Sequence, residues 1–239
     1  MRKKGGRLFL LCVLLLLSLA AVGLGVRWMH FTLLTRMEVV SLWSHEDAAW
    51  FWRRPVDIDL NEDAMVPEAI GAALEHYGSV RTVTLRRNTA AWLDACFSRW
   101  RHRGSVEVLM VMYSEMNDGH LAGFAGADLK SAIFNNNLVS GEVFPPSPHL
   151  AYLEYNGTPV TDAGLRHVVR QCPHLERLCL HTTGVTAAGV RASGVFKMPA
   201  LRVLTLKGME CSDAELRALK QEAAAVNPGL RVDLDLPDE

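Results

Sequence analysis

The 239-residue sequence lacks the motifs that identify most enzyme classes. It has no G-x-S-x-G nucleophile turn, no G-x-x-x-x-G-K-[ST] phosphate loop, no H-E-x-x-H zinc motif and no dinucleotide-type glycine loop. Its nine histidines are scattered along the chain. Cys179 and His181 would share one face of a strand, but no third group is placed to orient the histidine. We therefore expect no enzyme activity, no cofactor and no metal site.

The sequence also lacks a strong excess of charge, with a formal net charge of −1. The first 26 residues hold four of the 25 basic residues and no acidic one. The rest of the chain therefore carries 21 basic and 26 acidic residues, a net charge of −5. A mildly acidic domain has no electrostatic attraction for phosphates, so we expect no nucleic acid among the partners.

Cysteines are few, and their spacing does not match a metal site. There are five, and none forms a C-x-x-C pair. Cys12 lies in an apolar N-terminal run, and the others occupy apolar positions at residues 96, 172, 179 and 211. We interpret them as small buried side chains. The spacing specifies no disulfide, although it leaves one open.

The chain does have a repeated pattern, which is clearest from His149 to Leu180. There an L-x-x-L-x-[LY] segment leads through a turn and a helix-like stretch into a second copy at Leu175. Seven such segments recur at intervals of 21 to 26 residues, and they start at Pro55, Val80, Val106, Leu129, Leu150, Leu175 and Leu201. This is the period of a solenoid whose coils each hold one strand and one helix. Alternating apolar residues predict strands with one buried face.

Helix signals follow several of these segments. Asn117-Asp118, Thr161-Asp162 and the capping box Ser212-x-x-Glu215 mark helix starts. The copy at Leu129 has three prolines in residues 141–148 where a helix would lie, and Ser193-Gly194 predicts an irregular stretch in a later copy. A long helix over 213–226 ends at Asn-Pro-Gly, and the alternating residues 230–236 predict a capping strand.

The segment VTDAGLRHVVRQCPHLERLCL is similar to the cysteine-containing leucine-rich repeat subfamily of F-box substrate receptors and many bacterial proteins. The resemblance depends on Thr161-Asp162-x-Gly164-Leu165 and on Cys172-Pro173-x-Leu175. It is close over 150–206 and looser over 55–148. It implies an α/β solenoid with a curved parallel sheet on the concave face, helices on the convex face and a protein-binding role. No F-box-like segment precedes the repeats, so we expect no ubiquitin-related role.

The N-terminal residues suggest a membrane anchor. Residues 1–7 are a basic leader, and residues 8–26 form an uncharged run that would span about 28 Å as a helix. More basic residues precede the run than follow it closely, which predicts a cytoplasmic N-terminus and repeats outside the cytoplasm. Resemblance to short anchored bacterial repeat proteins suggests a bacterial envelope. The alternative is a signal peptide cleaved after Ser18-x-Ala20, which would release a secreted repeat protein.

Residues 27–54 are rich in tryptophan and precede the first repeat. Trp28 suits a membrane interface. We interpret Trp50, Phe51 and Trp52 as a cap over the first coil, which has no preceding neighbour. An aromatic ligand-binding cluster is the alternative. The run from His45 to Asp47 is interpreted as a solvated turn.

Residues 55–236 are predicted to form one solenoid of about seven repeats with a C-terminal capping strand. In each copy the residues beside the second and third apolar positions would point onto the concave face, in three columns. The first column is Asp57, Thr82, Val108, Ser131, Tyr152, Arg177 and Val203. The second column is Asp59, Thr84, Met110, Ile133, Glu154, Cys179 and Thr205. The third column is Asn61, Arg86, Met112, Asn135, Asn156, His181 and Lys207.

These columns place an apolar centre between charged ends, as at a protein-recognition surface. The residues predicted to contact a protein partner are Val108, Met110, Met112, Ile133, Tyr152, Glu154, Arg177, His181 and Lys207. One alternative is that the N-terminal aromatic segment or the proline-rich loop 144–148 covers this centre. A structural envelope protein without a discrete ligand is the competing functional class, and an enzyme with an unrecognised site is a third. The sequence does not identify the ligand.

Overall fold

The structure is a computed structural model that describes residue 15 and residues 18–26, 57–61, 66–77 and 80–235. The basic leader, the tryptophans of residues 27–54 and the acidic C-terminal end lie outside these residues. Of the predicted anchor, residues 18–26 are described, and they are helical and exposed. Within the described parts of the chain, no helix is both long enough and apolar enough to cross a membrane.

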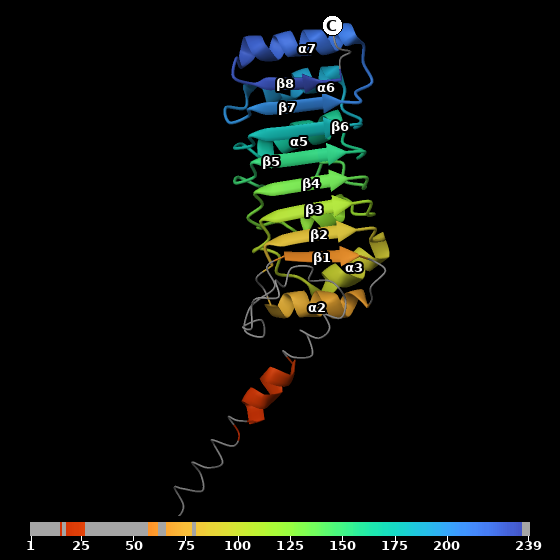
Figure 1. Ribbon diagram of the computed structural model, residues 1–239, viewed down its shortest axis with the longest axis vertical. Helices are drawn as coiled ribbons and strands as arrows, with labels where there is room; N and C mark the ends of the chain where they lie inside the picture. Colours follow the sequence, from red (N-terminus) through yellow and green to blue (C-terminus); the bar gives the residue numbers. More distant parts are fainter. Residues whose placement is uncertain (1–14, 16–17, 27–56, 62–65, 78–79, 236–239) are drawn as a thin grey trace, which may run out of the picture.

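Eight parallel strands form one sheet in the order in which they occur in the chain (Figure 1). They are β1 (Asp57–Asn61), β2 (Thr82–Arg86), β3 (Val108–Met112), β4 (Ser131–Asn135), β5 (Tyr152–Asn156), β6 (Arg177–His181), β7 (Val203–Lys207) and β8 (Arg231–Leu234). Sequential order means that each coil of the chain adds one strand beside the previous one. The predicted α/β fold, a parallel sheet with helices in a solenoid-like arrangement, is confirmed for the described residues.

Helices connect most of the strands and lie behind the sheet in the view of Figure 1, with α2 and α7 at its two ends. They are α2 (Pro67–Tyr77), α3 (Ala90–Arg99), α4 (Asp118–Ala122), α5 (Asp162–Gln171), α6 (Ala187–Ser193), the 3-10 helix η3 (Val195–Lys197) and α7 (Asp213–Val226). As predicted, β4 and β5 are joined without a helix. As also predicted, α6 ends early, at Gly194, whose φ of 81° is left-handed.

The strand register agrees with the three predicted columns. Met110 pairs with Ile133, Ile133 with Glu154, and Glu154 with Cys179. The same alignment holds from β1 to β7. A slip of one residue would turn every side chain of a strand to the opposite face, so the apolar positions alone were sufficient to set this register.

The core lies between the sheet and the helices. Leu153, Leu178 and Leu204, predicted to share one inward column, are fully buried. The predicted helix starts are also confirmed, because the side chains of Asn117, Thr161 and Ser212 each accept a hydrogen bond from the backbone N–H three residues later. These caps satisfy backbone donors that the first helical turn leaves without a partner.

One coil, the one that contains α3, differs from the others in where its helix begins. The helix already begins at Ala90, after its cap Thr89, so it starts earlier relative to the repeat than the other helices do. Ala95 is consequently only half-buried, and Leu93 and Cys96 supply the inward face of this helix.

The loop 144–148 packs into the core and takes the place of the missing helix. The ring of Phe144 is buried 6.4 Å from that of Phe134, whose side chain points inward. The backbone N–H of Ser147 donates to the carbonyl oxygen of Gln171 at the end of α5. The alternative that this loop covers the outer face of the sheet was therefore wrong, because its aromatic residue, Phe144, packs on the core side.

A left-handed residue follows each strand from β2 to β7. Their φ values lie between 48° and 61°, and they are Arg87, Tyr113, Asn136, Gly157, Thr182 and Gly208. In the first five of these, the backbone N–H donates to a carbonyl oxygen of the next coil. The left-handed turn therefore extends the coil-to-coil ladder by one bond. Only two of the six are glycine, so the sequence showed no common signal for this turn.

Candidate functional site

The nine residues predicted to bind a partner lie on the sheet face that points away from the core, which we call the open face. Arg177 and Lys207 are exposed, and the other seven are half-buried. They come from five adjacent strands, β3 to β7. Parallel strands lie about 4.8 Å apart, so register partners in adjacent strands contact each other. The structure thus brings these residues together on one continuous surface.

The centre of the open face is uncharged. On β3 it presents Val108, Met110 and Met112, and on β4 it presents Ile133 between Ser131 and Asn135. Met110 and Ile133 are register partners, so their side chains stand side by side. Two adjacent strands without an open-face charge form a region that a partner could desolvate at little electrostatic cost.

Charged and aromatic side chains interact directly on β5 and β6. The Tyr152 hydroxyl donates a hydrogen bond to the Glu154 carboxylate, and the Arg177 guanidinium lies 5.8 Å from the centre of the Tyr152 ring. Burial, followed by the neighbouring Glu154 carboxylate, raises the pKa of Tyr152. The phenol therefore stays protonated at neutral pH and acts as a donor on this surface.

The third column contributes polar groups with unused hydrogen-bonding capacity. Asn135, Asn156 and His181 are neighbours in register. Neither Oδ1 of Asn135 nor Nε2 of His181 has a hydrogen-bond partner among the described residues, although both atoms are buried. Each of these atoms therefore carries the energetic cost of a buried polar group without a partner. Lys207, at the end of this column, is 3.9 Å from Asp235, and both are exposed, so the pair contributes little.

Three residues of the second column do not take part in the accessible surface. Thr84, Cys179 and Thr205 were predicted to point outward, but all three side chains are buried. The Cys179 sulfur lies 3.7 Å from the Thr205 hydroxyl, and no described hydrogen bond joins it to His181. Burial also raises the pKa of Cys179, which disfavours the thiolate that a nucleophile needs.

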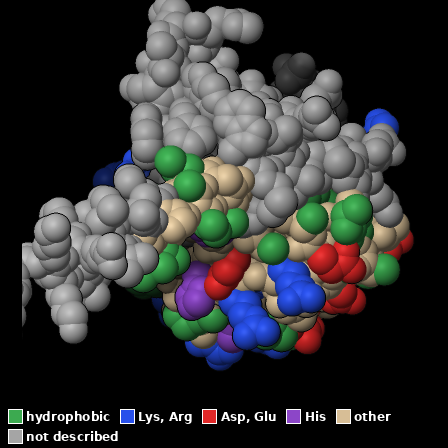
Figure 2. Space-filling model, turned by 90° about the horizontal axis from the view of Figure 1, so that it is seen from below, with side chains coloured by type: hydrophobic (Ala, Val, Ile, Leu, Met, Phe, Trp, Pro, Cys, Tyr) green, Lys and Arg blue, Asp and Glu red, His purple; other side chains and the backbone are tan. Residues whose placement is uncertain are grey.

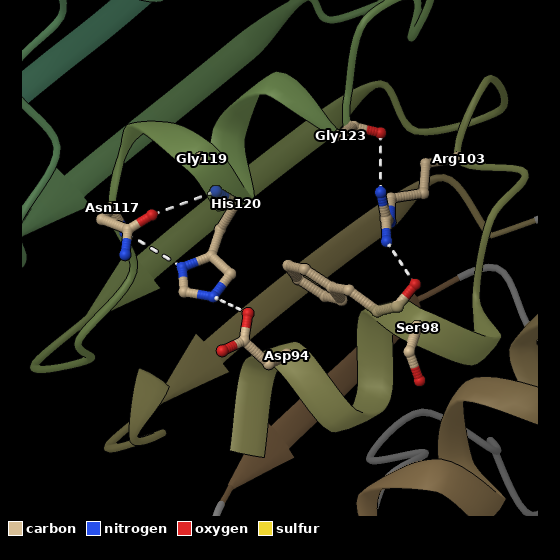
Figure 3. A pocket seen from close by; sticks show the side chains of 8 residues that line it. Asp94, Ser98, Arg103, Asn117, Gly119, His120 and Gly123 are labelled. Carbon is tan, nitrogen blue, oxygen red and sulfur yellow. Dashed lines mark hydrogen bonds and ion pairs between the residues drawn. The ribbon is translucent and has the colours of Figure 1, made fainter. Parts of the chain in front are cut away.

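A second candidate site lies on the helical side of the solenoid and was not found from the sequence. It is a pocket of about 400 Å³ between α3 and α4 (Figure 3). Its lining residues are Asp94, Phe97, Ser98, Arg103, Asn117, Gly119, His120 and Gly123. They come from two successive coils, and no single stretch of sequence contains them as a motif.

The arginine of this pocket joins the ends of two helices. Arg103 is buried, with Nη1 donating to the Gly123 carbonyl oxygen at 2.7 Å and Nη2 to the Phe97 carbonyl oxygen at 2.9 Å. Its guanidinium also lies 4.3 Å from the centre of the Phe97 ring. Burial lowers the pKa of Arg103. The negative ends of two helix dipoles and an aromatic face compensate the charge, so we interpret Arg103 as a structural clamp.

The histidine of the pocket is also fully engaged by the protein. The backbone N–H of Asn117 donates to Nδ1 of His120 at 3.2 Å, and Nε2 lies 3.0 Å from the Asp94 carboxylate. The side-chain oxygen of Asn117 in turn accepts a hydrogen bond from the backbone N–H of His120 at 3.1 Å. With both ring nitrogens occupied, His120 has no free lone pair for a substrate or a metal. The described residues also contain no cluster of three or more His, Cys, Asp or Glu that could hold a metal ion.

Comparison with known proteins does not identify a family for this chain. No protein-family model matches the chain, and no curated protein does. Among solved structures, an internalin from Listeria monocytogenes aligns at 12% sequence identity with a TM-score of 0.41. The alignment covers 70% of this chain and 57% of the internalin chain. The assignment of the solenoid therefore depends on the repeat and its strand register, and the function must be argued from the open face.

Proposed function

We propose that this chain is a leucine-rich-repeat module that binds a protein partner on its open face. One observation supports this most strongly, the uncharged surface of β3 and β4 beside the charged and aromatic residues of β5 and β6. Apolar residues concentrated at the centre of a polar surface are the usual composition of a protein-binding site. Methionine and tyrosine are also among the residues enriched there.

The rigidity of the sheet supports the same proposal. The residues that would contact the partner lie on strands whose register is fixed by the buried columns. Little backbone entropy would be lost on binding, so more of the contact energy would appear as affinity. The charges of the open face would orient the partner, because Glu154 and Arg177 form no ion pair with another described residue.

We further propose that residues 8–26 anchor the module in a membrane, with the N-terminus in the cytoplasm and the repeats outside it in a bacterial envelope. The support is the uncharged run in the sequence and the basic residues that precede it. Resistance to carbonate extraction from native membranes would support anchoring. Recovery of a soluble form that begins near Ala21 would instead show that the segment is a cleaved signal peptide.

The binding proposal can be tested on the full-length chain in lipid nanodiscs. Crosslinking in native membranes would first identify the bound protein, and its affinity would then be measured for the triple variant M110S/I133S/Y152S. We expect affinity to fall by about a hundredfold or more, since these side chains would be the central anchors. The matched control is V66S/V226S, which removes exposed apolar side chains at the two ends of the solenoid.

The possible outcomes separate the competing functional classes. Unchanged affinity in a folded triple variant would exclude the open face as the binding site. The absence of any saturable partner would favour a structural role.

The described surface at the N-terminal end of the solenoid has basic, acidic and hydrophobic side chains interspersed, so it presents no electrostatic field of a single sign (Figure 2). Recognition of a highly charged polymer is therefore not expected at that end.

A further inference from the structure

Large hydrophobic side chains are exposed on the loops that follow β3 and β4. The solenoid has five such side chains that are at least half exposed among its described residues, namely Val66, Tyr113, Leu138, Val143 and Val226. Tyr113 directly follows β3 and is 67% exposed, and Leu138 lies three residues after β4 and is 56% exposed. These are the two strands whose open face is uncharged. The apolar character therefore continues from the sheet onto the adjoining loops.

Both loops are held by the backbone of the neighbouring coil. The N–H of Tyr113 donates to the Asn135 carbonyl oxygen at 2.8 Å, and the N–H of Leu138 donates to the Met116 carbonyl oxygen at 2.8 Å. Leu138 also forms a parallel bridge with Asn117. Tyr113 and Leu138 thus project from ordered backbone, which lowers the entropic cost of using them in an interface.

Charged groups mark the limits of this apolar region. On one side, Arg86 is paired with Asp59 at 3.1 Å, and Arg87 takes the position equivalent to Tyr113 in the preceding coil. On the other side stands Glu154, whose only described hydrogen bond comes from the neutral Tyr152 hydroxyl. Its negative charge has no ion-pair partner among the described residues, and it borders Ile133 in register. A cation at this position would complement the charge.

We infer that the binding surface extends past the sheet, from Met110 and Ile133 over the ends of β3 and β4 onto Tyr113 and Leu138. Its occupant is a protein segment with an uncharged apolar patch and a basic residue beside it that meets Glu154. This inference rests on the proposed function, because the loop residues extend the open-face site. Tyr113 and Leu138 would determine specificity at its edge. Other coils have the polar Asn136 and Thr182 at the position of Tyr113, and Glu115 and Pro159 at the position of Leu138.

The probe for this inference is a displayed library of random peptides, selected on the full-length chain in nanodiscs after removal of binders to empty nanodiscs. Selected peptides should combine apolar residues with Lys or Arg. Their affinity should fall about tenfold or more for Y113N/L138S and for M110S/I133S. Asparagine tolerates the left-handed turn at residue 113, so the first variant should keep its melting temperature. The control for the two double variants is V66S/V226S. The variant E154Q removes the charge of Glu154, and its control is E176Q.

The possible outcomes distinguish failure of the extended surface from failure of the open-face site. Loss of affinity in M110S/I133S but not in Y113N/L138S would overturn the extended surface and leave the open-face site standing. Loss in the loop variant alone would overturn the open-face site, and the extension with it. Peptides without basic residues, or insensitive to E154Q, would overturn the assigned partner chemistry. Failure to select any peptide above empty nanodiscs would count against both proposals.

Discussion

The carboxylate of Asp162, at the start of α5, accepts two hydrogen bonds from Thr186, the N-cap of α6 in the next coil. The donors are the Thr186 backbone N–H and its hydroxyl, both at 2.8 Å. Asp118 accepts in the same way from the N–H and hydroxyl of Ser140, two coils earlier. An aspartate at the first helical position therefore ties each of these coils to the following one, which explains the Thr-Asp of the repeat motif.

We expect Asp162→Ala to lower the free energy of unfolding by about 1–3 kcal/mol, because it removes both bonds and leaves the Thr186 donors without their partner. Chemical denaturation would measure this. Asp213→Ala is the control, since Asp213 begins α7 and is exposed. Gly189→Ala should act through the same contact, because an added Cβ would lie 1.8 Å from Oδ1 of Asp162. Equal stability of the Asp162 and Asp213 variants would mean that the bridge between the coils contributes nothing.

Alanine substitution of the inward leucines tests the register. Leu153, Leu178 and Leu204 are fully buried in one column, so each change should cost about 2–5 kcal/mol through lost burial and cavity formation. Glu154→Ala, on the opposite strand face, should cost much less. Thermal and denaturant unfolding of the four variants gives the comparison. Similar losses for Leu153→Ala and Glu154→Ala would contradict the assigned faces of β5.

The left-handed turns predict opposite effects on stability for substitutions at Thr182 and at Gly157. Thr182 is exposed with a φ of 48°, and Thr182→Gly should leave stability unchanged or raise it by up to about 1 kcal/mol by relieving strain. Gly157→Ala should destabilise, since its φ is 61° and the new Cβ would lie 2.6 Å from Oδ1 of Asn136. Gly104→Ala, whose Cβ would meet nothing closer than 3.6 Å, is the control. A marked loss of stability in Thr182→Gly would contradict strain at this turn.

The buried thiols predict a loss of stability in alkaline solution. Burial raises the pKa of Cys96 and of Cys172 from 9.0 to about 12. Above pH 9 the unfolded chain therefore loses thiol protons that the folded chain keeps. The free energy of unfolding should consequently fall as pH rises from about 9 towards 12, by up to about 1.4 kcal/mol per pH unit for each thiol. Below pH 9 these thiols should contribute no pH dependence.

The double variant C96A/C172A tests this assignment through the slope of its unfolding free energy against pH. Its absolute stability is not the test, since both changes also leave cavities. Its unfolding free energy, measured at several pH values from 8 to 11, should fall less steeply than that of the parent chain. The remaining slope would come from Cys179, Cys211, Tyr152 and Tyr155, whose pKa values burial also raises. Identical slopes in the two proteins would show that the thiols do not titrate differently on unfolding.

The sequence by itself determined the coils, the strand register and the open-face columns. These depend on the alternation of apolar residues and on short capping residues, such as Thr161 and Ser212, whose physical effects act within a few positions of the chain. The resulting surface of Val108, Met110 and Ile133 can therefore be identified from the sequence alone. A shift of one residue would have buried charges such as Glu154, which leaves a single register possible.

The tertiary structure alone decided which groups from different coils meet. It placed Phe144 in the core instead of over the open face, buried Cys179, and joined Asp94 to His120 and Arg103 to Gly123. It also revealed that Tyr113 and Leu138 extend the apolar surface, because their exposure depends on how adjacent loops stack. Such contacts join residues about one coil apart, and no periodicity along the chain encodes them, since they depend on side-chain packing between coils.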